Sequence, residues 1–210
     1  YAGCVDTDPG RLRIGLMPDN HRDETHPDCE EATRRTANLL SDLGHEVVES
    51  RPEAFLQLGD LKELAWAFTV NWSAGAVVSL LTLGDQLGRT VTAKDVESGT
   101  WAMAQLGESY TAPDYIRAQG ILGGWRRSMA QWWNDFDVLL TPTTAQPPAR
   151  IGELTPTDDD PVRGSKGSLP YSVYTSPFNC TGQPAMSLPL GSSDGLPIGV
   201  QLVGAYGRED

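Results

Sequence analysis

The first fifty residues alternate between strand and helix patterns, and this alternation limits the possible folds more than any other feature. Residues 12–17 and 45–49 each have the pattern of a short strand. Between them, residues 27–43 place apolar or small side chains at helical spacing, with Pro27 in the first turn and Gly44 as the stop. Two strands joined by a helix through tight connections predict a βαβ unit, so the strands should pair in parallel.

The rest of the chain continues this mixture and predicts an α/β protein. Helical periodicity predicts one or two helices at residues 58–83, one from Thr92 or Asp95 to residue 106, and one at residues 112–136. Apolar runs predict three further strands, at residues 137–141, 185–190 and 198–204. Loops or turns are expected at residues 84–91, 143–170 and 191–195. Four residues of the last helix are expected mostly in the core: Trp125, Met129, Trp132 and Trp133.

The charge balance excludes one class of partner. Sixteen Lys and Arg against 28 Asp and Glu give a formal net charge of -12, and no basic cluster interrupts the acidic surface. Such a surface repels phosphate backbones, so we expect no nucleic acid partner. No stretch approaches the roughly 20 apolar residues needed to cross a bilayer, so no membrane partner is expected. Cys4, Cys29 and Cys180 are odd in number and far apart, which suits a reducing cytoplasm.

The sequence supports neither a nucleophile elbow nor a catalytic histidine. Gly191-x-Ser193-x-Gly195 has the spelling of a nucleophile elbow, but that elbow leads into a helix, and an apolar strand pattern follows here. A hairpin turn is the better interpretation. All three histidines, His21, His26 and His45, lie in the first quarter of the chain, and no pattern marks any of them as a base.

Two further groups of polar residues favour ordinary surface structure. The glycine-rich residues 164–168 lack the spacing of a phosphate loop and are expected to form a flexible surface loop. One dense group of metal-binding residue types fits no known zinc or calcium spacing, so a solvated loop entering a helix is favoured over a metal site. It comprises His21, Asp23, Glu24, His26, Asp28, Cys29 and Glu30.

The remaining signal lies at residues 174–185, where small polar side chains and backbone amides precede an apolar strand. The hydroxyl, carboxamide and N–H groups could orient a polar ligand at the lip of a pocket. By composition alone the segment is equally compatible with an ordinary loop.

Three segments together resemble the amidase-signature family. They are residues 137–144 with the Pro147-Pro148 and Ile151-Gly152-Glu153 motifs that follow, residues 178–185, and residues 195–204. The βαβ unit extends the resemblance over nearly the whole chain. The resemblance implies a mixed β-sheet sandwiched between helices. It also implies that residues 1–210 are the carboxy-terminal part of a single domain, truncated at both ends.

The family hydrolyses carboxamides with a Lys, a bridging Ser on a cis peptide bond and a nucleophilic Ser, without metal or cofactor. These residues belong to the family's amino-terminal half, so the resemblance implies no catalytic residue in this chain and an absent amino-terminal catalytic half as its partner. We expect the parent protein to be an amidase and this chain to be inactive alone.

The resemblance implies that this chain recognises a small-molecule amide. The candidate substrate-binding residues are Asn179, Cys180, Thr181, Gly182, Gln183, Thr141 and Thr143, with Asn71 and Trp72 as further pocket walls. For Trp72 a core position is the favoured alternative. Leu122 and Ser172 stand where glutamine-using relatives have an Arg and an Asp, so a zwitterionic amino acid is not the expected ligand.

Two functions stay open from the sequence. The Gly-Gln-Pro-Ala version of the motif, with residues 87–92, is similar to hydrolases of cyclic aminohexanoate dimers. The first function is therefore part of a hydrolase of linear or cyclic amides. The second is a non-catalytic subunit or small-molecule binding module derived from an amidase, and a homodimer is compatible with either.

Overall fold

The computed structural model of the protein describes residues 3, 7–20, 24–57, 61–157 and 159–209. The chain forms two compact units. The first comprises Tyr1–Leu56, Arg126–Ala149 and Pro170–Asp210, and the second comprises Gln57–Trp125 and Arg150–Leu169. The prediction that residues 1–210 belong to a single truncated domain stays a prediction.

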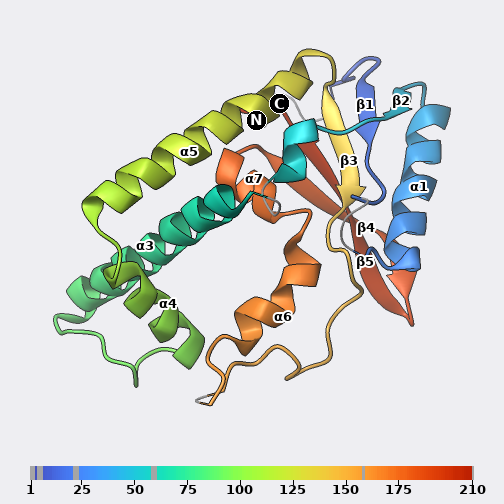
Figure 1. Ribbon diagram of the computed structural model, residues 1–210. Helices are drawn as coiled ribbons and strands as arrows, with labels where there is room; N and C mark the ends of the chain where they lie inside the picture. Colours follow the sequence, from blue (N-terminus) through green and yellow to red (C-terminus); the bar gives the residue numbers. More distant parts are fainter. Residues whose placement is uncertain (1–2, 4–6, 21–23, 58–60, 158, 210) are drawn as a thin grey trace. The chain divides into compact units, whose positions relative to one another are not determined.

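The first unit is built on a five-stranded mixed sheet with the order β2-β1-β3-β5-β4 (Figure 1). β1 pairs in parallel with β2 and with β3, whereas β5 pairs antiparallel with β3 and β4. The parallel β1–β2 pair and the α/β class are therefore as predicted. The strand bounds are β1 Arg13–Leu16, β2 Glu46–Glu49, β3 Val138–Pro142, β4 Ala185–Ser193 and β5 Leu196–Gly204.

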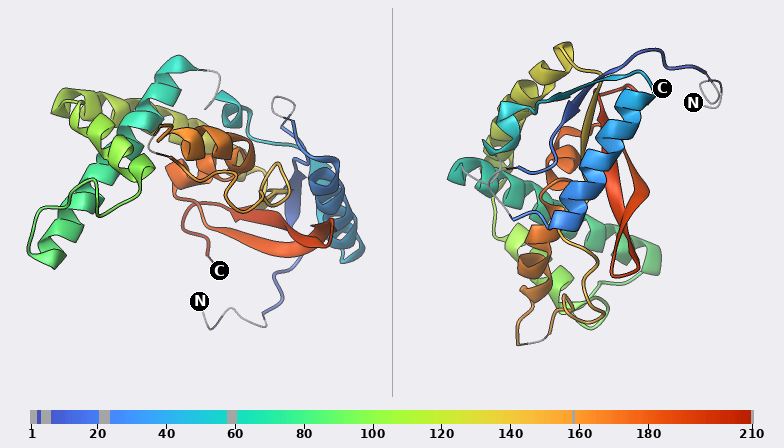
Figure 2. Two further views of the ribbon diagram at one scale, coloured as in Figure 1. Left: turned by 90° about the horizontal axis from the view of Figure 1, so that it is seen from below. Right: turned by 90° about the vertical axis from the view of Figure 1, so that its right-hand side faces the viewer.

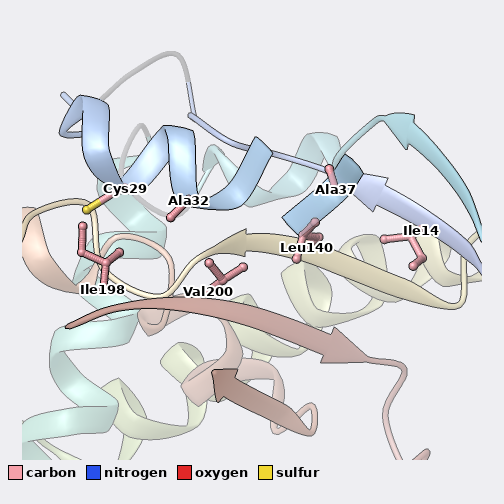
Figure 3. Packing of buried hydrophobic residues seen from close by; sticks show 7 residues of the cluster. All are labelled: Ile14, Cys29, Ala32, Ala37, Leu140, Ile198 and Val200. Carbon is pink, nitrogen blue, oxygen red and sulfur yellow. The ribbon is translucent and has the colours of Figure 1, made fainter. Parts of the chain in front are cut away.

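Helix α1 (Pro27–Asp42) lies along one face of this sheet (Figure 2). It begins where His26 Nδ1 accepts a hydrogen bond from the Asp28 N–H, which satisfies one of the unpaired amides of the first turn. Its small residues Ala32 and Ala37 allow close approach to the strands. The resulting core contains Ile14, Cys29, Ala32, Ala37, Leu140, Ile198 and Val200 (Figure 3).

Strands β4 and β5 form a hairpin whose turn consists of Asp194 and Gly195. Both have positive φ angles, 49° and 80°, as a two-residue type I′ turn requires. Ser193 is the last residue of β4, and its hydroxyl donates to the Asp28 carboxylate. A strand follows the turn, so the structure confirms that this Gly-x-Ser-x-Gly pattern is a hairpin and not a nucleophile elbow.

The described part of the second unit is largely helical. α3 (Lys62–Leu87) packs against α4 (Ser98–Glu108), as Figure 1 shows. Gly107 allows this approach, because a Cβ at its position would lie 2.4 Å from the backbone oxygen of Ser73. The other helical elements of the described residues are α5 (Ala112–Ala130), α6 (Arg163–Ser172), α7 (Ser176–Thr181) and the 3₁₀ segments η1 (Glu53–Phe55) and η2 (Gln131–Asn134).

Several predicted boundaries are wrong. Residues 84–91 are not a loop throughout, because α3 continues to Leu87 and ends at Gly88, whose φ is 64°. α4 begins at Ser98 and not at Thr92 or Asp95, because the Asp95 carboxylate accepts hydrogen bonds from Thr92 and Arg89 in the preceding turn. α5 ends at Ala130, and a 3₁₀ segment follows it.

The loop predicted for residues 143–170 is also wrong in part. α6 begins at Arg163 and contains Pro170, and the glycine-rich residues 164–168 lie within this helix and not in a flexible loop. Of the expected core residues, Trp125 and Met129 are buried. Trp132 and Trp133 are only partly buried. Trp132 stacks on Phe136 with ring centroids 4.3 Å apart.

The expectation that no segment is long and apolar enough to cross a bilayer is wrong for α3. Within the part of the chain that the structure describes, this helix meets the requirement by its length and composition, and 22% of its most apolar stretch is buried. A single helix of this kind is weak evidence for a membrane span, because the core helix of a soluble protein meets the same requirement. Its exposed apolar residues include Trp72, Val78, Leu81 and Leu87.

Candidate functional site

The candidate pocket segment forms a short helix in the first unit, where sequence reasoning left a pocket lip or an ordinary loop open. Pro177 lies in the first turn of α7, and Gly182 ends the helix in the left-handed region, at a φ of 72°. Only glycine adopts this conformation without strain, which explains the Gly of the motif. Of the candidate ligand residues, Asn179 is exposed, Thr181 is partly buried and Cys180 is buried.

Aromatic contacts and one strong hydrogen bond hold α7 in place. Phe178 is buried, with its ring centroid 5.9 Å from that of Phe55 and 6.4 Å from that of Trp133. The Arg126 guanidinium donates from Nε to the backbone oxygen of Cys180 at 2.6 Å. A charged donor on one of the last carbonyls of a helix is favourable, because it complements the negative end of the helix dipole. The exposed Asn179 is therefore carried on a well-anchored backbone.

Gln183 links α7 to the end of β5. Its Nε2 donates to the backbone oxygen of Gly204 at 2.9 Å. Its Oε1 is buried and finds no donor within the described residues. A buried acceptor without a partner costs about 1–3 kcal/mol. The Nε2 atom of Gln183 is therefore bonded within the protein, whereas its Oε1 atom could accept a hydrogen bond from a further donor.

Thr141 belongs to a buried hydrogen-bond network on β3 and β5. Gln201 Nε2 donates to Thr141 Oγ1 and to the backbone oxygen of Tyr174, both at 3.1 Å. The Thr141 hydroxyl in turn donates to the Pro142 carbonyl at 2.7 Å. Tyr174 is buried as well, and its hydroxyl lies 2.6 Å from Thr25 Oγ1. The Thr141 hydroxyl proton is therefore already engaged in a hydrogen bond within the protein.

Thr143 lies just beyond β3, and its hydroxyl forms a pair with that of Ser187 at 2.6 Å. The pair lies beside Gly199, where a Cβ would approach Ser187 Oγ to 2.6 Å and Thr143 Oγ1 to 2.7 Å. The bare backbone of β5 at this point is what brings the two hydroxyls together. Sequence reasoning missed Ser187, because a lone Ser in an apolar strand pattern carries no signal until its neighbouring strands are known.

The other two candidate residues, Asn71 and Trp72, lie on α3 in the second unit. The Trp72 side chain is 49% exposed and its ring centroid lies 6.0 Å from that of Phe68, so the core position favoured from the sequence is wrong. Asn71 Oδ1 accepts a hydrogen bond from Gln119 Nε2 of α5 at 2.6 Å. Sequence reasoning missed Gln119, because 48 residues separate it from Asn71 and no local pattern links them.

The two cysteine thiols of the described residues are held in an unreactive state. Burial raises the pKa of the Cys29 thiol to about 11, and the adjacent Asp28 carboxylate adds to the rise. Burial also raises the pKa of the Cys180 thiol to about 11, against the opposing effect of Arg126. Both thiols are therefore protonated near neutral pH, which disfavours nucleophilic attack or metal binding by them.

The histidines in the described residues are used by the fold. His26 Nδ1 caps α1, and His45 Nδ1 accepts from the Leu12 N–H at 3.2 Å. His21 and Asp23 of the suggested metal-ligand group, like Cys4, lie outside the described residues. Among the residues that are described, no three His, Cys, Asp or Glu side chains gather in a metal-binding arrangement.

A family model described as Amidase matches residues 3–210. Over the whole chain the sequence is 36% identical to a 6-aminohexanoate-cyclic-dimer hydrolase of Paenarthrobacter ureafaciens, and it covers 44% of that protein. It is 33% identical to a putative amidase, AmiC, of Mycobacterium tuberculosis (strain H37Rv), over 95% of this chain and 41% of the relative. The chain thus spans less than half the length of these relatives.

Solved structures agree with these sequence matches. The structure of a 6-aminohexanoate cyclic dimer hydrolase superposes with a TM-score of 0.86 at 35% identity, over 100% of this chain and 44% of that one. A bacterial aryl acylamidase of the amidase-signature family gives a TM-score of 0.67 at 18% identity, over 93% of this chain and 40% of that one, which shows a shared fold alone.

Proposed function

Because this chain belongs to the amidase family, we propose that it is part of an enzyme that hydrolyses carboxamide bonds. The observation that carries this proposal is the match of the family model to residues 3–210, together with 36% identity to a cyclic amide hydrolase over the whole chain. In this proposal the chain supplies walls of the substrate pocket.

We place the reactive groups of this enzyme in a part of the polypeptide outside this chain. The resemblance to the family suggests a Lys, a bridging Ser and a nucleophilic Ser that act without metal or cofactor. Two observations support this division. The chain corresponds to 44% of the cyclic-dimer hydrolase. The buried thiols of Cys29 and Cys180 are protonated near neutral pH, so neither is a substitute nucleophile.

The pocket proposed for this chain is lined by residues 179–183 with Thr141 and Thr143. Asn179 offers an exposed carboxamide on an anchored helix, and Gln183 Oε1 offers a buried acceptor that lacks a donor within the described residues. The Thr143–Ser187 pair adds hydroxyl groups that can donate or accept. Such groups orient an amide through its carbonyl and its N–H, while neighbouring apolar side chains exclude water.

We propose uncharged linear or cyclic amides as the substrate class. Leu122 is fully buried and apolar, and Ser172 carries no charge. A site without these two charges gives a zwitterionic amino acid no ion pair to offset the loss of its hydration. The cyclic-dimer hydrolase relative acts, by its name, on a cyclic amide, which makes cyclic amides the first compounds to test.

The test is hydrolysis by the natural polypeptide that carries this chain. Linear primary amides, anilides, glutamine and cyclic diamides are incubated with it, with and without a metal chelator, and released amine is measured. We expect turnover of uncharged amides, poor turnover of glutamine and no effect of the chelator. Absence of turnover over the whole panel would refute the proposal.

A pair of variants tests the pocket itself. Asn179→Ala removes an exposed carboxamide from the proposed pocket, and Asn134→Ala removes an exposed carboxamide from η2 as the matched control. Losing one hydrogen bond to substrate should raise KM about fivefold to tenfold in Asn179→Ala alone. Equal kinetics in both variants would remove Asn179 from the pocket.

A further inference from the structure

Two carboxamide side chains of the second unit are joined to each other. Asn71 lies near the middle of α3, and Gln119 lies on α5. Gln119 Nε2 donates to Asn71 Oδ1 at 2.6 Å, and both residues are partly buried. In this bond the amide nitrogen of Gln119 faces the carboxamide oxygen of Asn71.

This hydrogen bond leaves one donor group and one acceptor atom of the two side chains unused. A carboxamide carries an NH₂ donor and a carbonyl acceptor, so the pair still offers Asn71 Nδ2 and Gln119 Oε1. No hydrogen bond inside the described part of the chain uses either atom. Neither atom is buried without a partner, so both are open to solvent or to a ligand.

Two aromatic side chains of α3 lie close to Asn71 along the helix, and Phe68, three residues before it, is on the same side of the helix. Trp72 follows Asn71 directly and is 49% exposed, and the Phe68 ring lies 6.0 Å from it between centroids. A ligand that covered the Trp72 ring would gain from burying its large apolar surface. A donor, an acceptor and an aromatic surface on neighbouring residues suit a small, uncharged, polar molecule with an apolar body.

We propose that Asn71 and Gln119 bind one edge of a carboxamide ligand, and that this ligand is a primary amide or a small lactam. The ligand carbonyl accepts from Asn71 Nδ2, and its N–H donates to Gln119 Oε1. Both groups lie on one edge only in a primary amide or in a ring that holds the amide cis. In an ordinary secondary amide the trans configuration places them on opposite edges.

This inference rests on the proposed amide hydrolase function and narrows its ligand class, and a binding measurement tests it. The side-chain NH₂ signals of Asn71 and Gln119 are followed by NMR in the natural polypeptide during titration with δ-valerolactam. δ-Valerolactone, with the same ring and no N–H, and the trans amide N-methylacetamide are the comparison ligands. We expect both signals to shift with the lactam, and its Kd to be about tenfold lower than those of the comparison ligands.

Gln119→Glu gives the sharpest variant test. Glutamate offers only acceptors, so Asn71 must turn its NH₂ toward it and present its oxygen to the ligand. Lactam binding should then weaken about tenfold or more, while Gln105→Glu on the exposed face of α4, with the same change of charge, should leave it unchanged. Gln119→Met, which keeps the length without polar atoms, should also weaken binding and serves if the glutamate variant does not fold.

Three results would overturn the inference: equal affinity for lactam and lactone, equal effects of the Gln119 and Gln105 variants, or an Asn71 signal that does not move. The two proposals fail separately, since binding is measured without turnover. Lactam binding without hydrolysis of any amide would refute the hydrolase function alone, and amide hydrolysis without lactam binding would refute this inference alone.

Discussion

Replacing Gly107 with alanine should destabilise the second unit, although alanine is the better helix former. Gly107 lies in the last turn of α4, where it faces the middle of α3. An added Cβ would lie 2.4 Å from the Ser73 backbone oxygen and 2.7 Å from Val77 Cγ2. Backbone cannot rotate away as a side chain can, so the two helices themselves must move apart.

The size of the effect follows from two opposing contributions. The 2.4 Å contact must lengthen to at least 3.0 Å, a separation of about 0.6 Å between packed helices. Overpacking of this kind costs about 1–3 kcal/mol. Alanine gains at most about 1 kcal/mol over glycine in a helix, and less in a last turn. We therefore expect a net loss of about 1–2 kcal/mol in the free energy of unfolding.

Gly75 provides the matched control on the partner helix. It lies inside α3, and nothing is within 4 Å of the position of an added Cβ. Gly75→Ala should therefore stabilise the protein by about 0.5–1 kcal/mol through helix propensity alone. Urea unfolding of the wild type and the two variants, with hydrogen exchange of the α3 and α4 amides, measures both shifts.

The two substitutions are expected to have opposite signs, which makes the reasoning easy to refute. If Gly107→Ala stabilised the protein as much as Gly75→Ala, the close approach of α4 to Ser73 would be wrong. Asn71 and Trp72 lie less than one turn before Ser73, so a shift of α3 should also weaken lactam binding in the Gly107 variant only.

Two further predictions concern titratable groups. The pKa of Asp95 is held below its usual range by the hydrogen bond from Arg89 and by those from Thr92. The hydrogen bonds to the Asp95 carboxylate therefore stabilise this turn fully above the ordinary pKa of an aspartate. This stabilisation is lost as the pH falls from there through the lowered pKa of Asp95. Asp95→Asn should speed exchange of the Thr92 amide at neutral pH but have little effect at strongly acid pH. Burial raises the pKa of the Cys29 and Cys180 thiols to about 11, so both should resist alkylation at pH 8 until the protein unfolds. The rate of alkylation is measured in a variant whose third cysteine, Cys4, is replaced by serine.

Elements whose signals are local were predictable from the sequence. The periodic helix α1 lies between two short strand patterns, and Pro27 and Gly44 mark its ends, so the parallel pair followed from chain connectivity. The Asp194-Gly195 turn was predictable within a slightly wider range for the same reason. The resemblance to the amidase family, and with it the mixed sheet, is confirmed by the family model and by the solved structures.

The errors arose where specific contacts, which residue patterns do not reveal, decide the local structure. Gly84 suggested a loop, yet it lies inside the last turns of α3, where a glycine suits the close approach of the Arg89 carbonyl, 3.1 Å from the position of an added Cβ. Asp95 suggested a helix cap, yet Arg89 and Thr92 hold its carboxylate. The Asn71–Gln119 bond was invisible for a related reason, because neither residue has a pattern that points to the other helix.

The position of Gln201 has a consequence for protein engineering. Its carboxamide joins Thr141 on a neighbouring strand to the backbone before α7, while Ile198 and Val200 face the opposite side toward α1. A single residue inserted before Ile198 would exchange these faces, turn the apolar pair away from α1 and leave the buried backbone oxygen of Tyr174 without its donor. Fusions or inserted loops at Asp194-Gly195 avoid this inversion, because both strands keep their phase on either side of the graft.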